Sequence, residues 1–233
     1  MISNFYVAAY EAGVLNAPVA VWASEIENPL HLKKDTLHKI EKVEIATVPG
    51  AFQLLNVLND AECETIILAS EAMQYSKDSS ISLPRSVRHN DNLVWIIDDD
   101  THDCIWQRCV SFIPQALSLN KRFRFYRYKK GNYFEKHTDG AWPGSAINNK
   151  KVIHNFYHDR FSKMTFLIFL SDDFEGGKTQ FLVNGDAINI TTPKGAVLCF
   201  PHGIDPRHCV HSSAPIIEGI KYIIRSDILF SIG

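Results

Sequence analysis

From Phe123 onward the chain consists of short β-rich runs separated by turn residues, and this pattern constrains the fold more than any other feature. The runs cover residues 123–128, 164–170, 179–182, 188–191, 196–200 and 222–230. Turn sequences such as Lys129–Asn132, Asn184–Asp186 and Pro193–Gly195 separate them. Short strands at this spacing are typical of a β-sandwich or a barrel. We therefore predict a jelly-roll (double-stranded β-helix) core over residues 123–230.

Two helices are predicted upstream of these strands, which makes the fold mainly β with flanking α-helices. Asn59 is expected to begin an amphipathic helix that runs to about Met73, with acidic residues in its first turn. A second helix is expected over Asp103–Leu119, because apolar residues recur there at helical spacing. Pro114 should kink or end that second helix.

The chain shows no linker, repeat or low-complexity tract that would divide it into separate folding units. We therefore expect one domain over residues 47–233, with helical support over 59–119 and the β core after it. Residues 1–46 are treated as an N-terminal extension, to which the sequence assigns no definite structure.

Composition indicates a soluble protein with a sizeable core, since 45% of the 233 residues are hydrophobic. The formal net charge is only −2, so neither nucleic acid nor an anionic membrane is expected as the principal partner. The sequence shows no signal-peptide pattern and no apolar run of about 18 residues. Five cysteines without C-x-x-C spacing predict free thiols, so a cytoplasmic location is expected. The oligomeric state is not indicated.

The segment around His137 and Asp139 carries the most informative chemistry. On an extended backbone these two side chains point to the same face, so both can bind one metal ion. A histidine from a distant segment would complete a face of two histidines and one carboxylate, which is diagnostic of non-haem Fe(II) oxygenases. An isolated H-x-D pair is otherwise common on polar surfaces.

Three blocks of the sequence resemble prolyl 4-hydroxylase-like Fe(II)/2-oxoglutarate-dependent dioxygenases. Arg127–Asp139 is similar to the run R-Y-x-x-G-x-x-(F/Y)-x-x-H-x-D of that family, and Thr165–Thr179 is similar to its block T-x-x-x-Y-L-N…F-x-G-G-x-T. Pro193–Tyr222 is similar to its closing block P-x-G-x-x-x-x-F…H-x-x-x-P-(V/I)-x-x-G-x-K. The resemblance implies Fe(II) as cofactor, 2-oxoglutarate and O2 as co-substrates, and ascorbate as a candidate reductant.

The resemblance also selects the distal metal ligand. His202, His208 and His211 compete for this role, and only His211 stands at the family's spacing before Pro215 and the later landmarks. The implied catalytic and metal-binding residues are therefore His137, Asp139 and His211.

Lys221 matches the family position that binds the far carboxylate of 2-oxoglutarate. Arg225 shares a strand face with Lys221 and is the alternative anchor, unless it pairs with Asp227. Tyr128 matches a tyrosine that reaches the co-substrate, or else it is ordinary aromatic core.

The sequence departs from the family at two positions of the second block. Phe169 replaces the usual tyrosine, and Ser171 replaces the usual asparagine. Phe169 removes a possible hydroxyl contact to 2-oxoglutarate, so we expect weaker co-substrate binding or another donor in its place.

Candidate substrate contacts lie outside these blocks. Arg88 and Asn90 belong to a polar loop upstream of an apolar run, and a solvated turn is the alternative interpretation. Residues 141–162 form a long polar excursion that we expect over the mouth of the core, with Trp142 as a candidate contact. His154 and His158 are treated as loop residues.

The expected function is hydroxylation of an aliphatic C–H bond with release of succinate and CO2. A prolyl residue, another peptide or protein substrate, an amino acid, or another small molecule could be the substrate. The alternatives are a non-catalytic jelly-roll protein that binds metal for binding or sensing, and a zinc hydrolase with the same three ligands.

Overall fold

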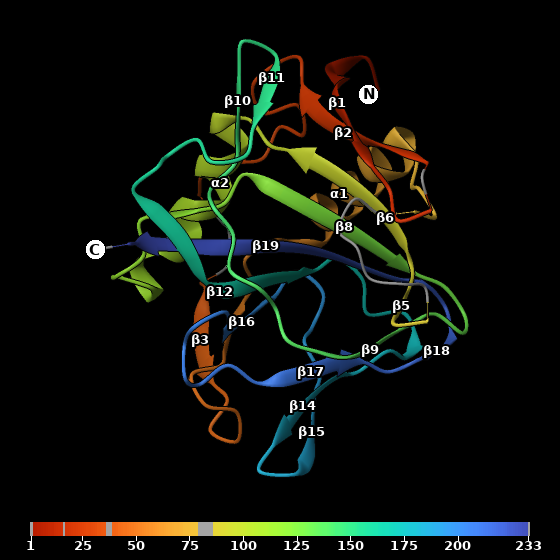
Figure 1. Ribbon diagram of the computed structural model, residues 1–233, viewed down its shortest axis with the longest axis vertical. Coiled ribbons are helices and arrows are strands. Elements are labelled where there is room, and N and C mark those ends of the chain that lie inside the picture. The colour runs from red at the N-terminus through yellow and green to blue at the C-terminus, as the bar shows by residue number, and fades with distance from the viewer. Residues whose placement is uncertain (1, 16, 36–38, 79–85, 233) are drawn as a thin grey trace.

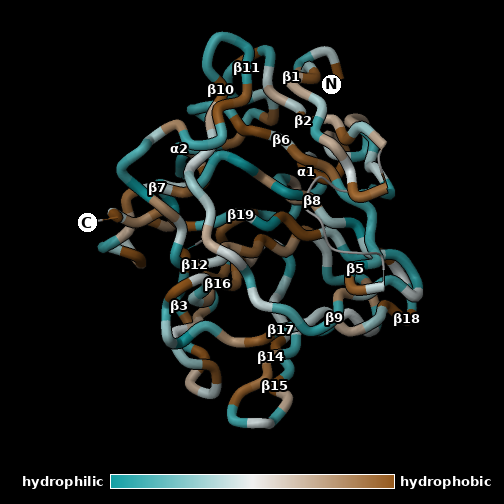
Figure 2. Tube along the Cα trace, in the orientation of Figure 1, coloured by the Kyte–Doolittle hydropathy of each residue, from teal (hydrophilic) through white to brown (hydrophobic). Residues whose placement is uncertain are grey.

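Two β-sheets lie face to face in the computed structural model, which describes residues 2–15, 17–35, 39–78 and 86–232. Strands β9, β14, β15 and β17 group together below the larger sheet in the view of Figure 1. Buried strands are hydrophobic and exposed turns are hydrophilic. Figure 2 shows this for the buried strand β6 and for the β10–β11 turn. The predicted mainly β fold is confirmed.

The larger sheet has ten strands, and its centre is occupied by the C-terminal strand β19. In spatial order it contains β1 (Phe5–Ala12), β2 (Pro18–Ser24), β6 (Asp91–Ile96), β8 (Arg122–Tyr128), β19 (Lys221–Ser231), β12 (Arg160–Phe169), β16 (Val197–Pro201), β4 (Phe52–Leu55) and β3 (Glu41–Glu44), and β7 (Ser118–Leu119) also pairs with β19.

The smaller sheet has five strands, two of which carry His137 and His211. Its order is β15 (Asp186–Ile190), β14 (Thr179–Val183), β17 (Val210–Ser213), β9 (Tyr133–His137) and β5 (Arg88–His89). Two strand pairs complete the β structure, β10 (Ala146–Asn148) with β11 (Lys151–Ile153) and β13 (Glu175–Gly176) with β18 (Ile216–Glu218).

Side-chain alternation along the central strands separates two hydrophobic cores. One face of the larger sheet packs against the helices, through residues such as Phe125, Phe166 and Ile224. The opposite face packs against the smaller sheet, where Leu167 and Phe181 belong to the same buried cluster. The candidate site lies in this second core, between the sheets.

The helices are α1 (Asp60–Met73), α2 (Asp99–Cys109) and the short 3₁₀ segments η1 (Ile2–Asn4) and η2 (Val110–Phe112). The predicted start of α1 is confirmed, because Asn59 and Glu62 form a reciprocal capping box. None of the helices within the described residues is long and apolar enough to cross a membrane.

The predicted second helix is wrong at both ends. It starts at Asp99, since the Asp98 side chain accepts a hydrogen bond from the backbone N–H of Thr101 and caps it. It ends well before Pro114, and Ser118–Leu119 pairs with β19 instead.

The N-terminal segment is part of both edges of the larger sheet. β1 and β2 form a hairpin, and β2 runs parallel to β6. β3 pairs with β4 at the opposite edge. All five cysteines are free, and four of them are buried.

Candidate metal centre

The three predicted metal ligands come together where the smaller sheet faces the central strands. His137 ends β9 and lies directly opposite His211 of β17 in the strand register. Asp139 follows His137 by two residues, just after the strand. One ligand atom from each of the three residues lies within 4.8 Å of the others. Two imidazoles and one carboxylate therefore converge on a single point.

Backbone carbonyls fix the orientation of both imidazoles. Nδ1 of His137 lies 2.7 Å from the carbonyl of Glu135, and Nδ1 of His211 lies 3.3 Å from the carbonyl of Cys209. Because a carbonyl only accepts, each Nδ1 carries the proton and each Nε2 keeps its lone pair. These Nε2 atoms lie 3.8 Å and 3.6 Å from the carboxylate oxygens of Asp139. Both rings thus offer Nε2 to a metal ion.

The carboxylate of Asp139 is held through one of its two oxygens. Oδ2 accepts a 2.7 Å hydrogen bond from the Thr165 hydroxyl and lies 3.3 Å from Nε of Arg225. Oδ1 is the oxygen nearer Nε2 of His137, Oδ2 lies nearer Nε2 of His211, and no hydrogen bond to Oδ1 is found among the described residues. This arrangement leaves Oδ1 as the natural ligand atom.

The protonation states suit a divalent cation. Burial opposes the charged form of Asp139, but Arg225 and the two imidazoles outweigh it and hold the pKa of this carboxyl below its usual range. Burial lowers the pKa of His137 to about 4 and also lowers the pKa of His211. At neutral pH the site therefore holds one carboxylate and two neutral imidazoles, the forms that bind metal.

Neither competing histidine offers a ligand atom to this point. His202 is buried with 1% of its surface exposed, and its two ring nitrogens lie 2.8 Å from the hydroxyls of Ser162 and Thr165. His208 contacts the carbonyl of Asp205 through Nδ1 in an exposed turn.

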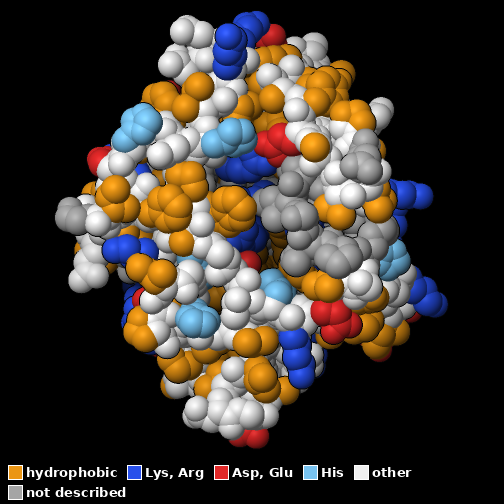
Figure 3. Space-filling model, in the orientation of Figure 1, with side chains coloured by type: hydrophobic (Ala, Val, Ile, Leu, Met, Phe, Trp, Pro, Cys, Tyr) orange, Lys and Arg blue, Asp and Glu red, His pale blue; other side chains and the backbone are white. Residues whose placement is uncertain are grey.

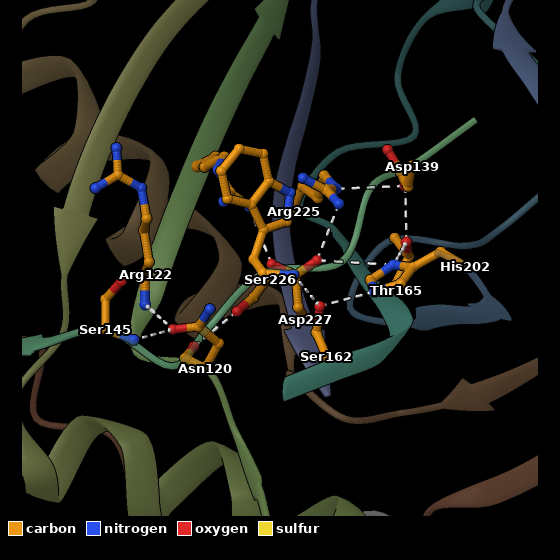
Figure 4. A network of polar contacts seen from close by, with 12 residues as sticks. Asn120, Arg122, Asp139, Ser145, Ser162, Thr165, His202, Arg225, Ser226 and Asp227 are labelled. Carbon is orange, nitrogen blue, oxygen red and sulfur yellow. Dashed lines mark hydrogen bonds and ion pairs between the residues drawn. The ribbon is translucent and has the colours of Figure 1, made fainter. Parts of the chain in front are cut away.

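His202 instead links the metal ligands to the segment that carries Trp142. The backbone N–H of Trp142 donates to Ser162, whose hydroxyl contacts Nε2 of His202. Since Thr165 donates to Asp139, its oxygen accepts from Nδ1 of His202. Figure 4 shows the contacts that link Ser162, His202 and Thr165 and end on Oδ2 of Asp139.

Thr165→Val should weaken metal binding about 10- to 100-fold, because it removes the donor that orients Asp139 and the acceptor that orients His202. Thr165→Ser, which keeps the hydroxyl, should bind Co(II) within about threefold of wild type. Calorimetric titration with Co(II) measures both. Equal affinity of the Val variant and wild type would show that the hydroxyl does not position the ligand.

A cavity of about 110 Å³ opens beside the three ligands. Its floor is the inner face of β8, β12 and β19, with Tyr126, Leu167 and Ile223 between two basic residues, Lys221 and Arg225. The full lining comprises Arg88, Tyr126, Tyr128, Phe134, His137, Thr138, Asp139, Gly140, Trp142, Leu167, Thr179, His211, Ser212, Ser213, Lys221, Ile223 and Arg225.

Lys221 is a buried cation in this cavity, with 1% of its surface exposed. Its ammonium donates to the carbonyl of Gly177 at 2.6 Å and to the hydroxyl of Ser213 at 3.1 Å. No carboxylate among the described residues pairs with it, and burial lowers the pKa of Lys221 to about 7. The ring of Phe169 lies 5.4 Å from the ammonium.

The remaining predicted contacts divide into two groups. Arg88, Tyr128 and Trp142 line the cavity, and burial raises the pKa of the Tyr128 hydroxyl. Asn90 is buried but is not among the described residues that line the cavity.

The excursion over residues 141–162 borders the cavity only near its start, at Trp142. Its β10–β11 hairpin instead lies beside β1, at the top of Figure 1.

Sequence reasoning missed Thr165 and Arg124 as residues of this region, whereas the alternative that Arg225 pairs with Asp227 is confirmed. Asp227 is fully buried and binds both Arg124 and Arg225, at 3.1 Å and 2.9 Å. The acidic residue Asp227 within the apolar run of β19 was the sequence signal for a buried ion pair.

No known family model and no curated protein matches the sequence. Solved structures do share its fold. A viral collagen prolyl hydroxylase of Paramecium bursaria Chlorella virus-1, solved with 2OG, is 18% identical, with a TM-score of 0.52 over 83% of this chain and 97% of that one.

Two further structures show the same fold. A Trichoplax adhaerens prolyl hydroxylase, in complex with a peptide fragment of the hypoxia inducible factor oxygen degradation domain, is 16% identical, with a TM-score of 0.52 over 77% of this chain and 83% of that one. HygX of Streptomyces hygroscopicus, with nickel and 2-oxoglutarate bound, is 12% identical, with a TM-score of 0.51 over 80% and 84%. The predicted jelly-roll fold is thereby confirmed.

Proposed function

We propose that the protein is an Fe(II)- and 2-oxoglutarate-dependent dioxygenase that hydroxylates an aliphatic C–H bond and releases succinate and CO2. The observation that carries this proposal is the convergence of His137, Asp139 and His211 in one cavity with the buried Lys221. Three protein ligands on one face leave metal positions open for co-substrates. A buried ammonium can bind the far carboxylate of a keto diacid.

The residues present fit both groups. Two neutral imidazoles and a carboxylate are the donor set of non-haem Fe(II) oxygenases. The cavity of about 110 Å³ is lined by these three ligands and by Lys221, so a keto acid bound there can contact both. Iron and the keto acid together supply the O2-dependent oxidation, with decarboxylation to succinate as the accompanying step.

The protein's own side chains hold and orient these reactants. Oδ1 of Asp139 and the two Nε2 atoms would hold the iron, while Thr165 and Arg225 keep Oδ2 in place. The apolar floor between Lys221 and Arg225 excludes water from the path between substrate and metal.

Lys221 is favoured over Arg225 as the anchor for 2-oxoglutarate. Arg225 is already 2.9 Å from Asp227 and 3.3 Å from Asp139, so part of its charge is neutralised. The contacts of Lys221 with Gly177 and Ser213 are both neutral. A carboxylate beside Lys221 would supply the missing counter-charge.

The proposal is tested by anaerobic titration of the Fe(II)-loaded protein with 2-oxoglutarate. Chelation of the keto acid should produce a weak visible metal-to-ligand charge-transfer band. A non-catalytic metal-binding protein would bind iron without developing this band, and that outcome would overturn the proposal. Zinc-supported hydrolysis without oxygen consumption would favour a hydrolase instead.

The affinity for 2-oxoglutarate should fall as pH rises above about 7, because the anchor is then deprotonated in the free protein. Above that pH the apparent dissociation constant should rise by up to about tenfold per pH unit. In Lys221→Arg the guanidinium stays charged, so the profile should be flat to about pH 9. Titration of the charge-transfer band between pH 6 and 9 measures both profiles, and identical slopes would exclude Lys221 as the anchor.

A further inference from the structure

We propose that the prime substrate is a small free carboxylic acid, of the size of an amino acid, whose carboxylate is bound by Arg225. This inference rests on the proposed function and names the substrate class of the same cavity. It assigns the two ends of the cavity floor to two different acids.

The geometry of β19 separates two cationic positions. Lys221, Ile223 and Arg225 alternate along the strand and all line the cavity. At a rise of about 3.3 Å per residue, the two basic residues start about 13 Å apart. The apolar side chain of Ile223 lies between them. One end therefore suits the co-substrate, and the other remains for a second acid.

Arg225 lies at the metal end of this floor. Its Nε is 3.3 Å from the metal ligand Asp139, and its Nη2 donates to Asp227 at 2.9 Å. Nη1 makes no hydrogen bond to any residue that the structure describes. A carboxylate bound to Nη1 would be separated from the metal ligands by about the length of a short aliphatic chain. A C–H bond a few atoms from that carboxylate could therefore lie beside the metal.

The buried charges around this point do not balance. Arg124 and Arg225 share Asp227. Asp139, whose side chain is 9% exposed, is the other acid of the network and lies 3.3 Å from Arg225 (Figure 4). With Lys221 there are three cations against two carboxylates. A divalent metal and a doubly charged keto acid cancel each other, so one positive charge remains in excess.

An uncompensated buried charge is unfavourable, and a bound carboxylate would neutralise it. Asp139 is the only acid among the described residues that line the cavity. Basic side chains also lie at the floor of the hollow in the centre of the face in Figure 3.

The position of the two arginines favours a free acid over a residue within a peptide. Arg124 and Arg225 are only 3% and 7% exposed, and the ring of Trp142 lies 5.3 Å from the Arg124 guanidinium. Within a peptide the backbone carboxyl group is part of an amide and carries no charge. It therefore cannot neutralise the excess positive charge in the cavity.

The experiment adds probes to the anaerobic Fe(II)–2-oxoglutarate complex and follows the shift of its charge-transfer band. The probes are the twenty L-amino acids and their des-amino analogues, which carry a carboxylate without an ammonium, the primary amides of both sets, and the same residues as N-acetyl amides. We expect at least one free acid to shift the band with an affinity about 10- to 100-fold above that of its amide. Succinate release in air should show the same preference.

Arg225→Met should reduce this acid-to-amide ratio to about one. A variant with a merely disturbed site would lose affinity for both probes and keep the ratio. Arg207→Met is the matched control, because Arg207 pairs with Asp205 on the surface, and it should keep the wild-type ratio.

A charge-transfer band that no free acid shifts more than its amide would overturn this inference and leave the proposed function standing. Preference for the blocked residues would also overturn it, in favour of a peptide substrate. Absence of the band with iron bound would overturn the proposed function and this inference together.

Discussion

His211→Ala should lose metal binding by at least about 100-fold and abolish 2-oxoglutarate turnover, whereas His208→Ala should retain both. His211 is one of three residues whose ligand atoms lie within 4.8 Å of each other. Its removal leaves His137 and Asp139 alone, too few to hold iron in competition with water. His208 lies in an exposed turn and contacts the carbonyl of Asp205. Co(II) titration and succinate release measure the two properties.

The paired design also tests the choice among three histidines. An active His211→Ala protein together with an inactive His208→Ala protein would transfer the ligand role to His208. His202→Ala forms a third case, since His202 contacts Thr165 rather than the ligand point. It should weaken metal binding about tenfold without abolishing it.

Asp227→Asn should destabilise the fold by about 3–5 kcal/mol, because it leaves two buried guanidinium groups without their shared carboxylate. For a domain of this size that corresponds to a lowering of Tm by about 6–20 °C. Urea denaturation of the metal-free protein measures the free energy of unfolding. Asp205→Asn, which removes a surface ion pair with Arg207, should cost no more than about 1 kcal/mol.

A double variant separates the charge effect from packing. Arg124→Met combined with Asp227→Asn removes one cation with the shared carboxylate, so its destabilisation should be smaller than the sum of the single changes. Additive losses would show that the Asp227 carboxylate does not act through Arg124.

The metal ligands could be predicted because they occupy short motifs with fixed spacing. His137 and Asp139 are neighbours on one extended segment, so alternation alone places them on one face. The landmark Pro215 distinguished His211 from two nearby histidines, and the structure brings His211 opposite His137 in the strand register. The six strand runs predicted after Phe123 match β8, β12, β14, β15, β16 and β19, because turn residues bound them. The strands β9 and β17, which carry the two histidines, were not among the predicted runs.

The buried polar contacts between different strands could not be predicted, because those strands are distant in sequence. Arg124 on β8 meets Asp227 on β19, and Thr165 on β12 meets Asp139 after β9. Nothing local to any of these residues specifies its partner. The prediction of the second helix was wrong for another reason, because the start of α2 depends on the single capping side chain of Asp98.

The central position of β19 makes the site depend on contacts between distant parts of the chain. β19 lies between β8 and β12, so the sheet is divided into two halves until residues 221–231 insert. Contacts of such high sequence separation give a high contact order, which is associated with slow folding. Lys221 and Arg225 enter the cavity on that same strand. The histidines on β9 and β17 therefore have these two cations beside them only when β19 is paired with its neighbours, which makes the complete site dependent on the complete sheet.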